Sequence, residues 1–278
     1  MTELFISDLD GTLLNHEHRV SERSAEILNG LIEDGVNFTV ATARNIGTAF
    51  DKIAPLHLKI PVSFMNGVFL YMQNDPKPVS VLPLPPGQAQ LLLEESRKVG
   101  ASPMFYSLNT RTDKIELQYA DLDFRARREF YEARRNSVYK QFIRADRYEF
   151  RDECVPVYIN FLEESETLKR VQPIVESLTG ISYVYYYDPV LKAWYLESFS
   201  EKAGKAAGAR QIAKLIGADR IVSFGDNEND RSMFEISDEC YATANADEPI
   251  RKIADGVIGS CDEDGVAEFL RKRFPQKQ

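Results

Sequence analysis

The chain has 278 residues, of which 44% are hydrophobic and 28% charged, a composition typical of folded globular proteins of one or two domains. Its formal net charge of -9 at pH 7 argues against nucleic acid or an anionic membrane as a partner, because both require a basic patch. There is no apolar run of about 18 residues, and the opening MTELFISDLD lacks the features of a signal peptide, so we expect a cytoplasmic protein.

The first third of the chain alternates short apolar runs with helical patterns, which is typical of βαβ units on a parallel sheet. Ser21 is a candidate helix cap, and Gly35 marks the end of the same helix. The dipeptide Asn66-Gly67 predicts a tight turn, after which the chain returns over 68–72 as the second arm of a hairpin. The predicted strands of this region are 4–7, 36–41 and 61–65.

Proline-rich stretches between residues 74 and 87 interrupt this pattern and mark a candidate domain boundary. From about residue 84 to 190, antiparallel strand patterns mix with helical patterns, which predicts an inserted α+β domain. The βαβ pattern then resumes, with a helix over 203–216 that ends at Gly217. The sequence therefore predicts an α/β protein with a Rossmann-like parallel-sheet core and an α+β insert; the core comprises 1–82 and 192–278, and the insert 83–191.

Polar side chains follow the predicted core strands where those strands end. Asp8 and Asp10 follow the first strand, Thr42 follows the second, and Asp226 follows a strand at 220–224. Ligands of open α/β sheets bind beyond the carboxyl ends of the strands, so these residues would converge on one crevice. Each segment alone is an ordinary turn or helix cap. Two carboxylates one residue apart repel, however, so Asp-x-Asp predicts a metal ion or a shared proton.

These residues, in this order, resemble the haloacid dehalogenase superfamily of phosphatases, and in particular its Cof-like subfamily, which carries a large α/β cap after the third core strand. The subfamily more often has Gly at the position of Ala43, which is a small departure. Lys205 fits the motif lysine by its downstream spacing, and the competing Lys202 does not. The matching segments are DLDGT at 8–12, ATAR at 41–44, the lysine at 205 and GDNEND at 225–230.

The resemblance implies a metal-assisted nucleophilic mechanism. Asp8 would attack the phosphoryl group and form an aspartyl-phosphate, which divides one difficult displacement into two easier ones. Mg²⁺ would be held by Asp8, the backbone carbonyl of Asp10 and Asp226, because hard divalent cations prefer oxygen ligands. Asp10 would protonate the leaving alcohol and then activate water, so its pKa would have to be raised relative to that of Asp8.

The remaining motif residues are implied to bind and neutralise the phosphoryl group. Arg44 is open to two interpretations, a contact with substrate or an exposed salt bridge. Asp230 would hold the lysine or a metal-bound water. The groups expected to bind phosphoryl oxygens are Thr42, the N–H groups of Leu9 and Ala43, Lys205 and Asn229.

The function expected from this resemblance is Mg²⁺-dependent hydrolysis of a small phosphomonoester, either a sugar phosphate or a phosphorylated cofactor. Two alternatives remain: a phosphotransferase of the phosphosugar mutase kind, and a catalytically silent regulator that binds a phosphosugar. The expected partner is a small phosphorylated metabolite, with neither nucleic acid nor membrane involved. The insert would act as the cap that sets substrate specificity, although it contains no readable motif, and the sequence does not indicate an oligomeric state.

Overall fold

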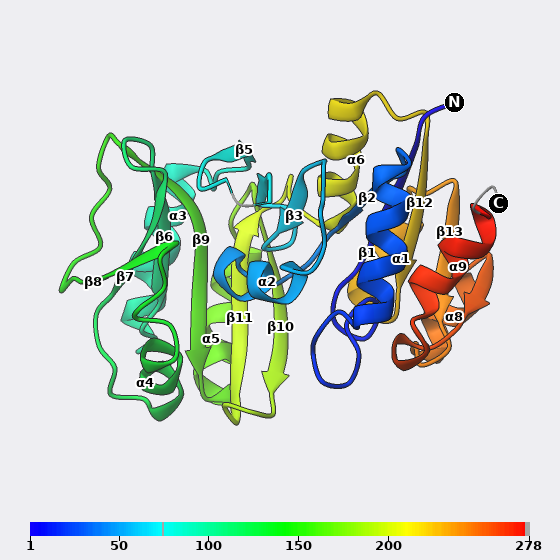
Figure 1. Ribbon diagram of the computed structural model, residues 1–278. Coiled ribbons are helices and arrows are strands. Elements are labelled where there is room, and N and C mark those ends of the chain that lie inside the picture. The colour runs from blue at the N-terminus through cyan, green and yellow to red at the C-terminus, as the bar shows by residue number, and fades with distance from the viewer. Residues whose placement is uncertain (74, 276–278) are drawn as a thin grey trace. The chain divides into compact units, whose positions relative to one another are not determined.

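The protein consists of two compact units in the computed structural model, which describes residues 1–73 and 75–275. Unit 1 comprises Met1–Ser80 and Ala203–Gln278, and unit 2 comprises Val81–Lys202. Their elements are labelled in Figure 1. Among the described helices, none is long and apolar enough to cross a membrane.

A five-stranded parallel sheet forms the centre of unit 1, with the order β14-β13-β12-β1-β2. β1 lies between β12 and β2, so that Ser7 is in register with both Phe224 and Val40. The residues that follow these three strands therefore meet at one edge of the sheet, and the predicted Rossmann-like core is confirmed. The strands are β1 (Glu3–Ser7), β2 (Asn37–Val40), β12 (Arg220–Gly225), β13 (Glu239–Thr243) and β14 (Gly256–Ile258).

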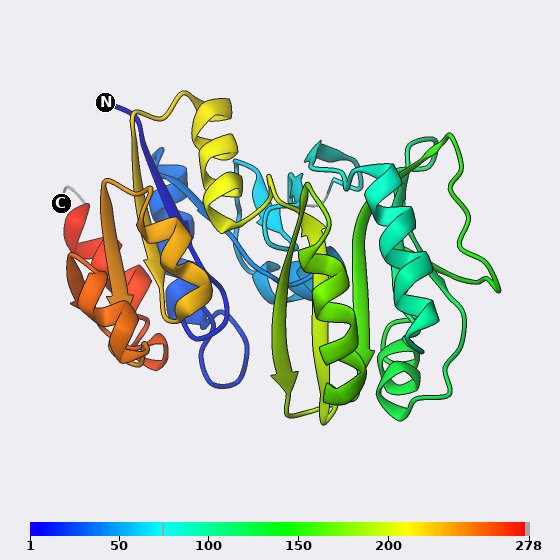
Figure 2. The same cartoon turned by 180° about the vertical axis from the view of Figure 1, so that it is seen from behind.

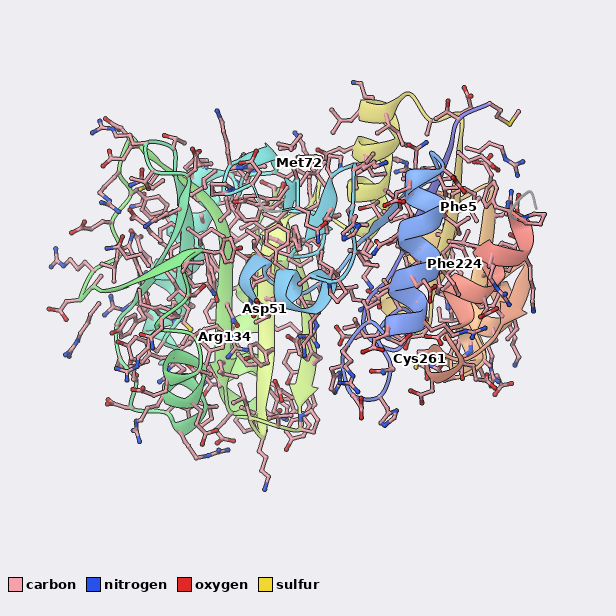
Figure 3. The ribbon with its side chains drawn as sticks, in the orientation of Figure 1. Phe5, Asp51, Met72, Arg134, Phe224 and Cys261 are labelled. Carbon is pink, nitrogen blue, oxygen red and sulfur yellow. The ribbon has the colours of Figure 1, made fainter. Side chains whose placement is uncertain are left out.

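Helices cover both faces of this sheet, as the two opposite views in Figures 1 and 2 show. On one face, Leu4 and Ile6 of β1 pack in a cluster with Ile212 of α6. On the other face, Phe5 meets Phe274 edge to face, with ring centroids 5.5 Å apart, and Figure 3 shows Phe5 and Phe224 on the sheet. The flanking helices are α1 (Glu22–Glu33), α6 (Lys205–Ile216), α7 (Arg231–Phe234), α8 (Glu248–Ile253) and α9 (Gly265–Arg273).

The predicted helix boundaries have local physical causes. Ser21 caps α1, because its side chain accepts a hydrogen bond from the backbone N–H of Ser24 at 2.9 Å. The α1 helix ends just before Gly35, whose φ of 97° is strained for any residue with a Cβ. Gly217 ends α6 in the same left-handed region, with φ of 65°.

The third predicted strand lies in a separate sheet, of order β3-β4-β5. The strand is joined to the parallel sheet by a single parallel bridge between Ala41 and Ser63. The predicted hairpin turn is confirmed, because Asn66 and Gly67 both have positive φ, of 54° and 78°. Unit 1 thus includes α2 (Ile46–Ile53), β3 (Val62–Phe64), β4 (Phe69–Tyr71) and most of β5 (Pro78–Val81).

Unit 2 is an α+β structure, as predicted, with a six-stranded sheet of order β10-β11-β9-β6-β7-β8. All of its pairings are antiparallel except that of β7 with β8. α3 (Pro86–Lys98) and α5 (Ser165–Glu176) cover one face with an apolar cluster, and α4 (Arg125–Glu132) contacts β9. The strands are β6 (Met104–Asn109), β7 (Lys114–Tyr119), β8 (Lys140–Arg144), β9 (Cys154–Glu163), β10 (Ile181–Asp188) and β11 (Ala193–Ser200).

The second junction between the units differs from the expected boundary at residue 192. β11 pairs with β10 on one side and with β9 on the other, so it belongs to the sheet of unit 2. Unit 1 resumes only at Ala203.

Candidate active site

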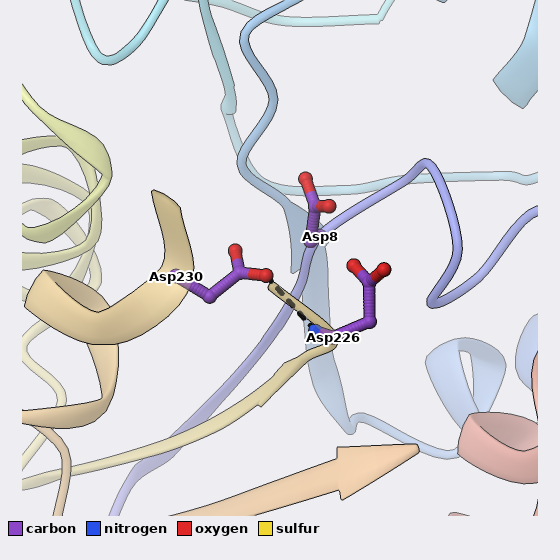
Figure 4. A group of neighbouring side chains, drawn as sticks. All are labelled: Asp8, Asp226 and Asp230. Atoms are coloured by element: carbon purple, nitrogen blue, oxygen red, sulfur yellow. Dashed lines mark hydrogen bonds between the residues drawn. The ribbon is translucent and has the colours of Figure 1, made fainter. Parts of the chain in front are cut away.

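Three carboxylates gather at the carboxyl edge of the parallel sheet in unit 1 (Figure 4). Asp8 directly follows β1, and its backbone N–H donates to the carbonyl of Phe224 at 2.9 Å, which continues the strand pairing. Asp226 directly follows β12, and Asp230 ends the short 3-10 helix Glu228–Asp230. One oxygen from each of the three carboxylates lies within 4.8 Å of the others.

Lys205, at the start of α6, neutralises part of this cluster. Its Nζ contacts Asp8 Oδ1 at 2.7 Å and Asp230 Oδ1 at 2.6 Å. It also donates to Asn229 Oδ1 at 2.8 Å, so all three ammonium protons have an acceptor. The side chain of Lys205 is buried, whereas the competing Lys202 is exposed. The structure therefore places Lys205 in contact with the carboxylate cluster and leaves Lys202 exposed.

Asp230 positions the lysine and the loop after β12. Its Oδ1 accepts from Lys205, and its Oδ2 accepts the backbone N–H groups of Asp226 at 2.9 Å and Asn227 at 3.2 Å. Gly225 is required here, because a Cβ at that position would lie 2.6 Å from Cβ of Asp230. Both oxygens of Asp230 are thus engaged by the protein, which leaves Asp8 and Asp226 as the carboxylates open to a metal ion.

The charges of the cluster do not balance. Burial raises the pKa of Asp8 to about 8, with Lys205 opposing and Asp230 and Asp226 adding to the rise. Burial and the charge of Asp230 likewise raise the pKa of Asp226 to about 6. Burial alone would lower the pKa of Lys205, but the two carboxylates it contacts raise it, so the lysine keeps its proton. With all three carboxylates ionised beside one ammonium, the net charge would be -2. The raised pKa values of Asp8 and Asp226 reflect this excess of negative charge, which a divalent cation would neutralise.

The donor set suits a hard cation such as Mg²⁺, because every candidate ligand is an oxygen. Thr12 Oγ1 donates to Asp226 Oδ1 at 3.1 Å and so fixes one carboxylate oxygen. Gly11 permits this approach, since a Cβ there would lie 2.3 Å from Asp226 Oδ2 and φ is +76°. Asp10, whose carbonyl is the third expected ligand, belongs to the same turn.

Asp10 and Arg44 form a two-pronged salt bridge, in which Nε and Nη2 of Arg44 donate to the two carboxylate oxygens at 2.6 Å each. Partial burial acts to raise the pKa of Asp10, but the hydrogen bonds and the charge of Arg44 hold it below its usual value. This is the reverse of the expected order, in which the pKa of Asp10 would exceed that of Asp8. Of the two interpretations of Arg44, this structure shows the salt bridge, with Asp10 as the partner.

The residues expected to bind a phosphoryl group occupy two places. Lys205 and Asn229 lie at the carboxylate cluster, whereas Leu9 and Ala43 directly follow Asp8 and Thr42 in the chain. Thr42 is buried, and its Oγ1 accepts the N–H of Arg44 at 3.1 Å, which leaves the hydroxyl proton for another acceptor. The backbone N–H groups of Leu9 and Ala43 have no acceptor among the described residues. Leu9 is fully buried, and an unpaired buried N–H is costly unless a ligand accepts from it.

Two further residues, which received no role from the sequence, hold the turn after Asp10. Asn245 Nδ2 and Thr243 Oγ1 donate to the carbonyl oxygen of Gly11 at 2.7 and 3.3 Å. Asn245 Oδ1 in turn accepts the N–H of Cys261 at 2.9 Å. Residue spacing alone does not indicate which atoms the amide of Asn245 contacts, because the turn at Gly11 and Asn245 are far apart in the chain.

Comparison with known proteins identifies the family. A family model described as haloacid dehalogenase-like hydrolase matches residues 5–270. The 5-amino-6-(5-phospho-D-ribitylamino)uracil phosphatase YitU of Bacillus subtilis is 25% identical over 98% of this chain and 97% of its own length. The phosphatase YwpJ of Bacillus subtilis is 25% identical over 97% of this chain and 99% of its own length. A haloacid dehalogenase-like hydrolase from Bacteroides thetaiotaomicron has the same fold, with a TM-score of 0.78 at 21% identity, covering 99% of this chain and 100% of that chain.

These matches extend over nearly the whole chain, so they include both units and all the motifs. The resemblance seen in the motifs is confirmed, as is the α/β fold. The expectation of a phosphoric monoester hydrolase agrees with the names of both relatives, which are phosphatases. The chain belongs to the family of haloacid dehalogenase-like hydrolases.

Proposed function

We propose that the protein is a Mg²⁺-dependent phosphatase that hydrolyses a small phosphomonoester through an aspartyl-phosphate on Asp8. The observation that carries the proposal is the contact of Lys205 Nζ with Asp8 and Asp230, next to Asp226, at the carboxyl edge of the sheet. Lys205 opposes the rise in the pKa of Asp8 that burial causes, and a bound Mg²⁺ would lower that pKa further, so that Asp8 could attack as the carboxylate. The proposed location is the cytoplasm.

In the first step, a carboxylate oxygen of Asp8 attacks phosphorus, and the bond between phosphorus and the ester oxygen breaks. The leaving oxygen takes a proton from Asp10, and the alcohol departs. Mg²⁺ held by Asp8, Asp226 and the carbonyl of Asp10 would offset the negative charge that otherwise repels the nucleophile. Thr42, Lys205 and the free N–H groups of Leu9 and Ala43 would hold the phosphoryl oxygens.

In the second step, Asp10 takes a proton from water, whose oxygen attacks phosphorus and releases inorganic phosphate and the Asp8 carboxylate. The salt bridge with Arg44 suits this step, because it keeps Asp10 ionised. The first step needs the protonated form, so Arg44 must leave Asp10 when substrate binds. A phosphoryl group is a suitable competitor, since guanidinium binds phosphate in the same two-pronged way. Arg44 would then contact substrate.

The substrate we propose is a phosphate ester of a sugar, a sugar alcohol or a cofactor of similar size. The substrate named for YitU carries its phosphate on a ribitylamino chain, which is derived from a sugar alcohol. The alternatives are a phosphosugar mutase-like transfer and a silent regulator. Mutase action would release no phosphate, and a regulator would not need the four charged residues that meet at this site.

The test is phosphate release from p-nitrophenyl phosphate and a panel of sugar phosphates with Mg²⁺, for the wild-type chain and Asp8→Asn. The control is Asp34→Asn, which makes the same change at an exposed position after α1. We expect turnover by the wild type and the control and a loss of about 10⁴-fold or more in Asp8→Asn. Reaction in ¹⁸O-labelled water should place one labelled oxygen in the released phosphate. Equal inactivity of all three proteins would refute the enzyme proposal.

A further inference from the structure

The loop between β1 and α1, residues 11–20, begins directly after Asp10 at the carboxyl edge of the parallel sheet (dark blue in Figure 1). It brings His18 back to that residue, and Nδ1 of His18 lies 3.6 Å from Oδ1 of Asp10. This separation is slightly longer than a hydrogen bond. Asp10 thus has two nitrogen groups close by: Arg44, which engages both of its oxygens, and His18, which engages neither.

The turn 15–19, which carries His18, is closed by its own hydrogen bonds. Asn15 Oδ1 accepts the backbone N–H groups of Glu17 and Arg19 at 3.1 and 3.2 Å, and the carbonyl of Asn15 accepts that of His18 at 2.8 Å. The N–H of Asn15 donates to the carbonyl of Arg19 at 3.1 Å. The φ of His18 is 54°, a conformation that His and Asn adopt more readily than most residues with a Cβ. The ring of His18 is therefore placed by the turn as a whole.

Asp262 ties this turn to the C-terminal part of unit 1. Its Oδ1 accepts the backbone N–H of His16 at 2.8 Å and lies 2.9 Å from the ring Nδ1 of the same residue. Asp262 belongs to the short 3-10 helix Cys261–Glu263, whose first backbone N–H donates to Asn245 Oδ1 at 2.9 Å. Asn245 in turn holds the carbonyl of Gly11 at 2.7 Å. The beginning of the loop and the turn 15–19 are thus fixed to the same segment of the chain.

Arg44 cannot orient Asp10 throughout the proposed reaction. In the first step Arg44 exchanges Asp10 for the phosphoryl group, so the carboxyl group loses the two hydrogen bonds that orient it. The side chain of Asp10 is 42% exposed, so packing alone does not fix its rotamer. A general acid must nevertheless be held at the leaving oxygen. The nitrogen that remains close to the carboxyl group is Nδ1 of His18.

We propose that His18 is a positioning residue that holds the carboxyl group of Asp10 for proton transfer once Arg44 has moved to the phosphoryl group. Asp262 positions His18 in turn, by fixing the turn 15–19 through His16. A movement of about 0.7 Å brings Nδ1 of His18 to hydrogen-bond distance from Oδ1 of Asp10. Oδ2 then remains free to pass its proton to the leaving oxygen. This inference rests on the proposed phosphatase function and adds positioning residues to its first step.

The test uses esters that differ in their need for a proton. p-Nitrophenolate leaves readily as an anion, whereas the alkoxide of an alkyl ester must be protonated as it leaves. The quantity measured is kcat/KM for the best alkyl ester among D-ribose 5-phosphate, D-glucose 6-phosphate and glycerol 3-phosphate, divided by kcat/KM for p-nitrophenyl phosphate.

In His18→Ala this ratio should fall about 10-fold, because Asp10 is displaced and not removed. His18→Asn should keep the ratio within about threefold of the wild-type value, since asparagine retains a donor and adopts the same φ. The matched control is His57→Ala, which removes an exposed histidine elsewhere in unit 1 and should leave the ratio unchanged.

Asp262→Ala should lower the same ratio about threefold, and Asp262→Asn should preserve it, because the amide oxygen still accepts from His16. In the His18→Ala background, Asp262→Ala should have no further effect, since it acts through His18.

Three results would overturn the inference and leave the phosphatase proposal intact: an unchanged ratio in His18→Ala, an equal loss on both kinds of ester, or independent effects of the two substitutions. A wild type that hydrolyses p-nitrophenyl phosphate but no alkyl ester would also overturn it, because no step would then need the proton. A wild type that hydrolyses no ester at all would refute the phosphatase proposal itself.

Discussion

Unit 1 and unit 2 each bury charged side chains, and they balance the charges in different ways. At the edge of the parallel sheet, Lys205 forms salt bridges with Asp8 and Asp230, and one oxygen of Asp226 lies within 4.8 Å of an oxygen of each of these carboxylates. On the face of the unit 2 sheet opposite the apolar cluster under α3 and α5, Lys140 and Glu197 form no salt bridge with each other. Lys140 Nζ lies 4.9 Å from the ring centre of Tyr106, and Glu197 accepts a hydrogen bond from Tyr158 at 2.9 Å. The first arrangement has an excess of carboxylates that a divalent cation would balance, whereas the second holds one lysine and one glutamate among aromatic rings and hydroxyl groups. This difference can be tested by removing one charge at a time.

The largest effect should come from Lys205→Met. This change leaves Asp8 and Asp230 buried without their shared cation, which typically costs about 3–5 kcal/mol of unfolding free energy. Turnover should also fall about 100- to 1,000-fold, since the lysine would offset charge at the nucleophile. Urea denaturation and steady-state kinetics measure the two effects. The control Lys214→Met, at the exposed end of the same helix, should change neither stability nor turnover. If Lys205→Met were as stable and active as the wild type, the charge of Lys205 would not be needed in unit 1, which contradicts the comparison.

Binding of Mg²⁺ should have the next largest effect on stability, and it should depend on the carboxylates of unit 1. At about 100 times its dissociation constant, the ion should add about 2.7 kcal/mol to the unfolding free energy. Asp226→Asn should abolish this increase. In EDTA at pH 7, however, this variant should be at least as stable as the wild type. The pKa of Asp226 is higher in the folded than in the unfolded chain, so ionised Asp226 destabilises the fold at pH 7, and asparagine removes that charge. Thermal unfolding with and without Mg²⁺ measures both; an unchanged Mg²⁺ response would exclude Asp226 as a ligand.

Lys140→Met should change the pH dependence of stability. The pKa of Lys140 is lowered to about 7 in the folded state, so the unfolded chain binds more protons between pH 7 and about 10.5. Wild-type stability should therefore increase with pH in that window by up to about 1.4 kcal/mol per pH unit, relative to Lys140→Met. Urea denaturation at pH 7 and pH 9 measures the difference. Lys114→Met, at the exposed start of β7, should show no such trend, and a parallel response of the two variants would contradict the lowered pKa.

Arg44→Met should produce the smallest change, a shift in the pH profile. Arg44 holds the pKa of Asp10 below its usual value, so the substitution should raise that pKa. If water activation by ionised Asp10 limits turnover, the acidic limb of the kcat profile should then move to higher pH. The measurement is kcat from pH 4 to pH 8, with Arg23→Met as an exposed control. A shift to lower pH would assign the limb to another group.

The sequence predicted the parts of the site that depend on local chain order. Asp8, Thr42 and Asp226 follow strands whose apolar runs are visible, and Gly217 ends a helix whose spacing selected Lys205. Contacts between distant segments were not predictable in this way. The salt bridge of Arg44 with Asp10 depends on the relative position of two turns. That position is set by the register of β1 with β2, which residue spacing alone does not specify.

The elements that sequence reasoning missed share a physical feature. β8 is short, begins and ends with a charged residue, and is a strand because it pairs in parallel with β7. α9 follows a one-turn 3-10 helix and carries three basic residues in its last turn, so its apolar stripe is brief. In each case tertiary pairing outweighs local pattern.

The division of unit 1 into two chain segments has a consequence for synthesis on the ribosome. β1 and Asp8 emerge first, but β12, Lys205 and Asp226 emerge only after the whole of unit 2 has been made. Unit 2 is one continuous segment and can fold while the ribosome is still translating, since domains generally fold as units. Until β12 has been synthesised, the edge of β1 that pairs with β12 in the finished sheet has no partner strand. A nascent chain halted before β12 should therefore expose an apolar strand edge, which is a natural target for chaperones.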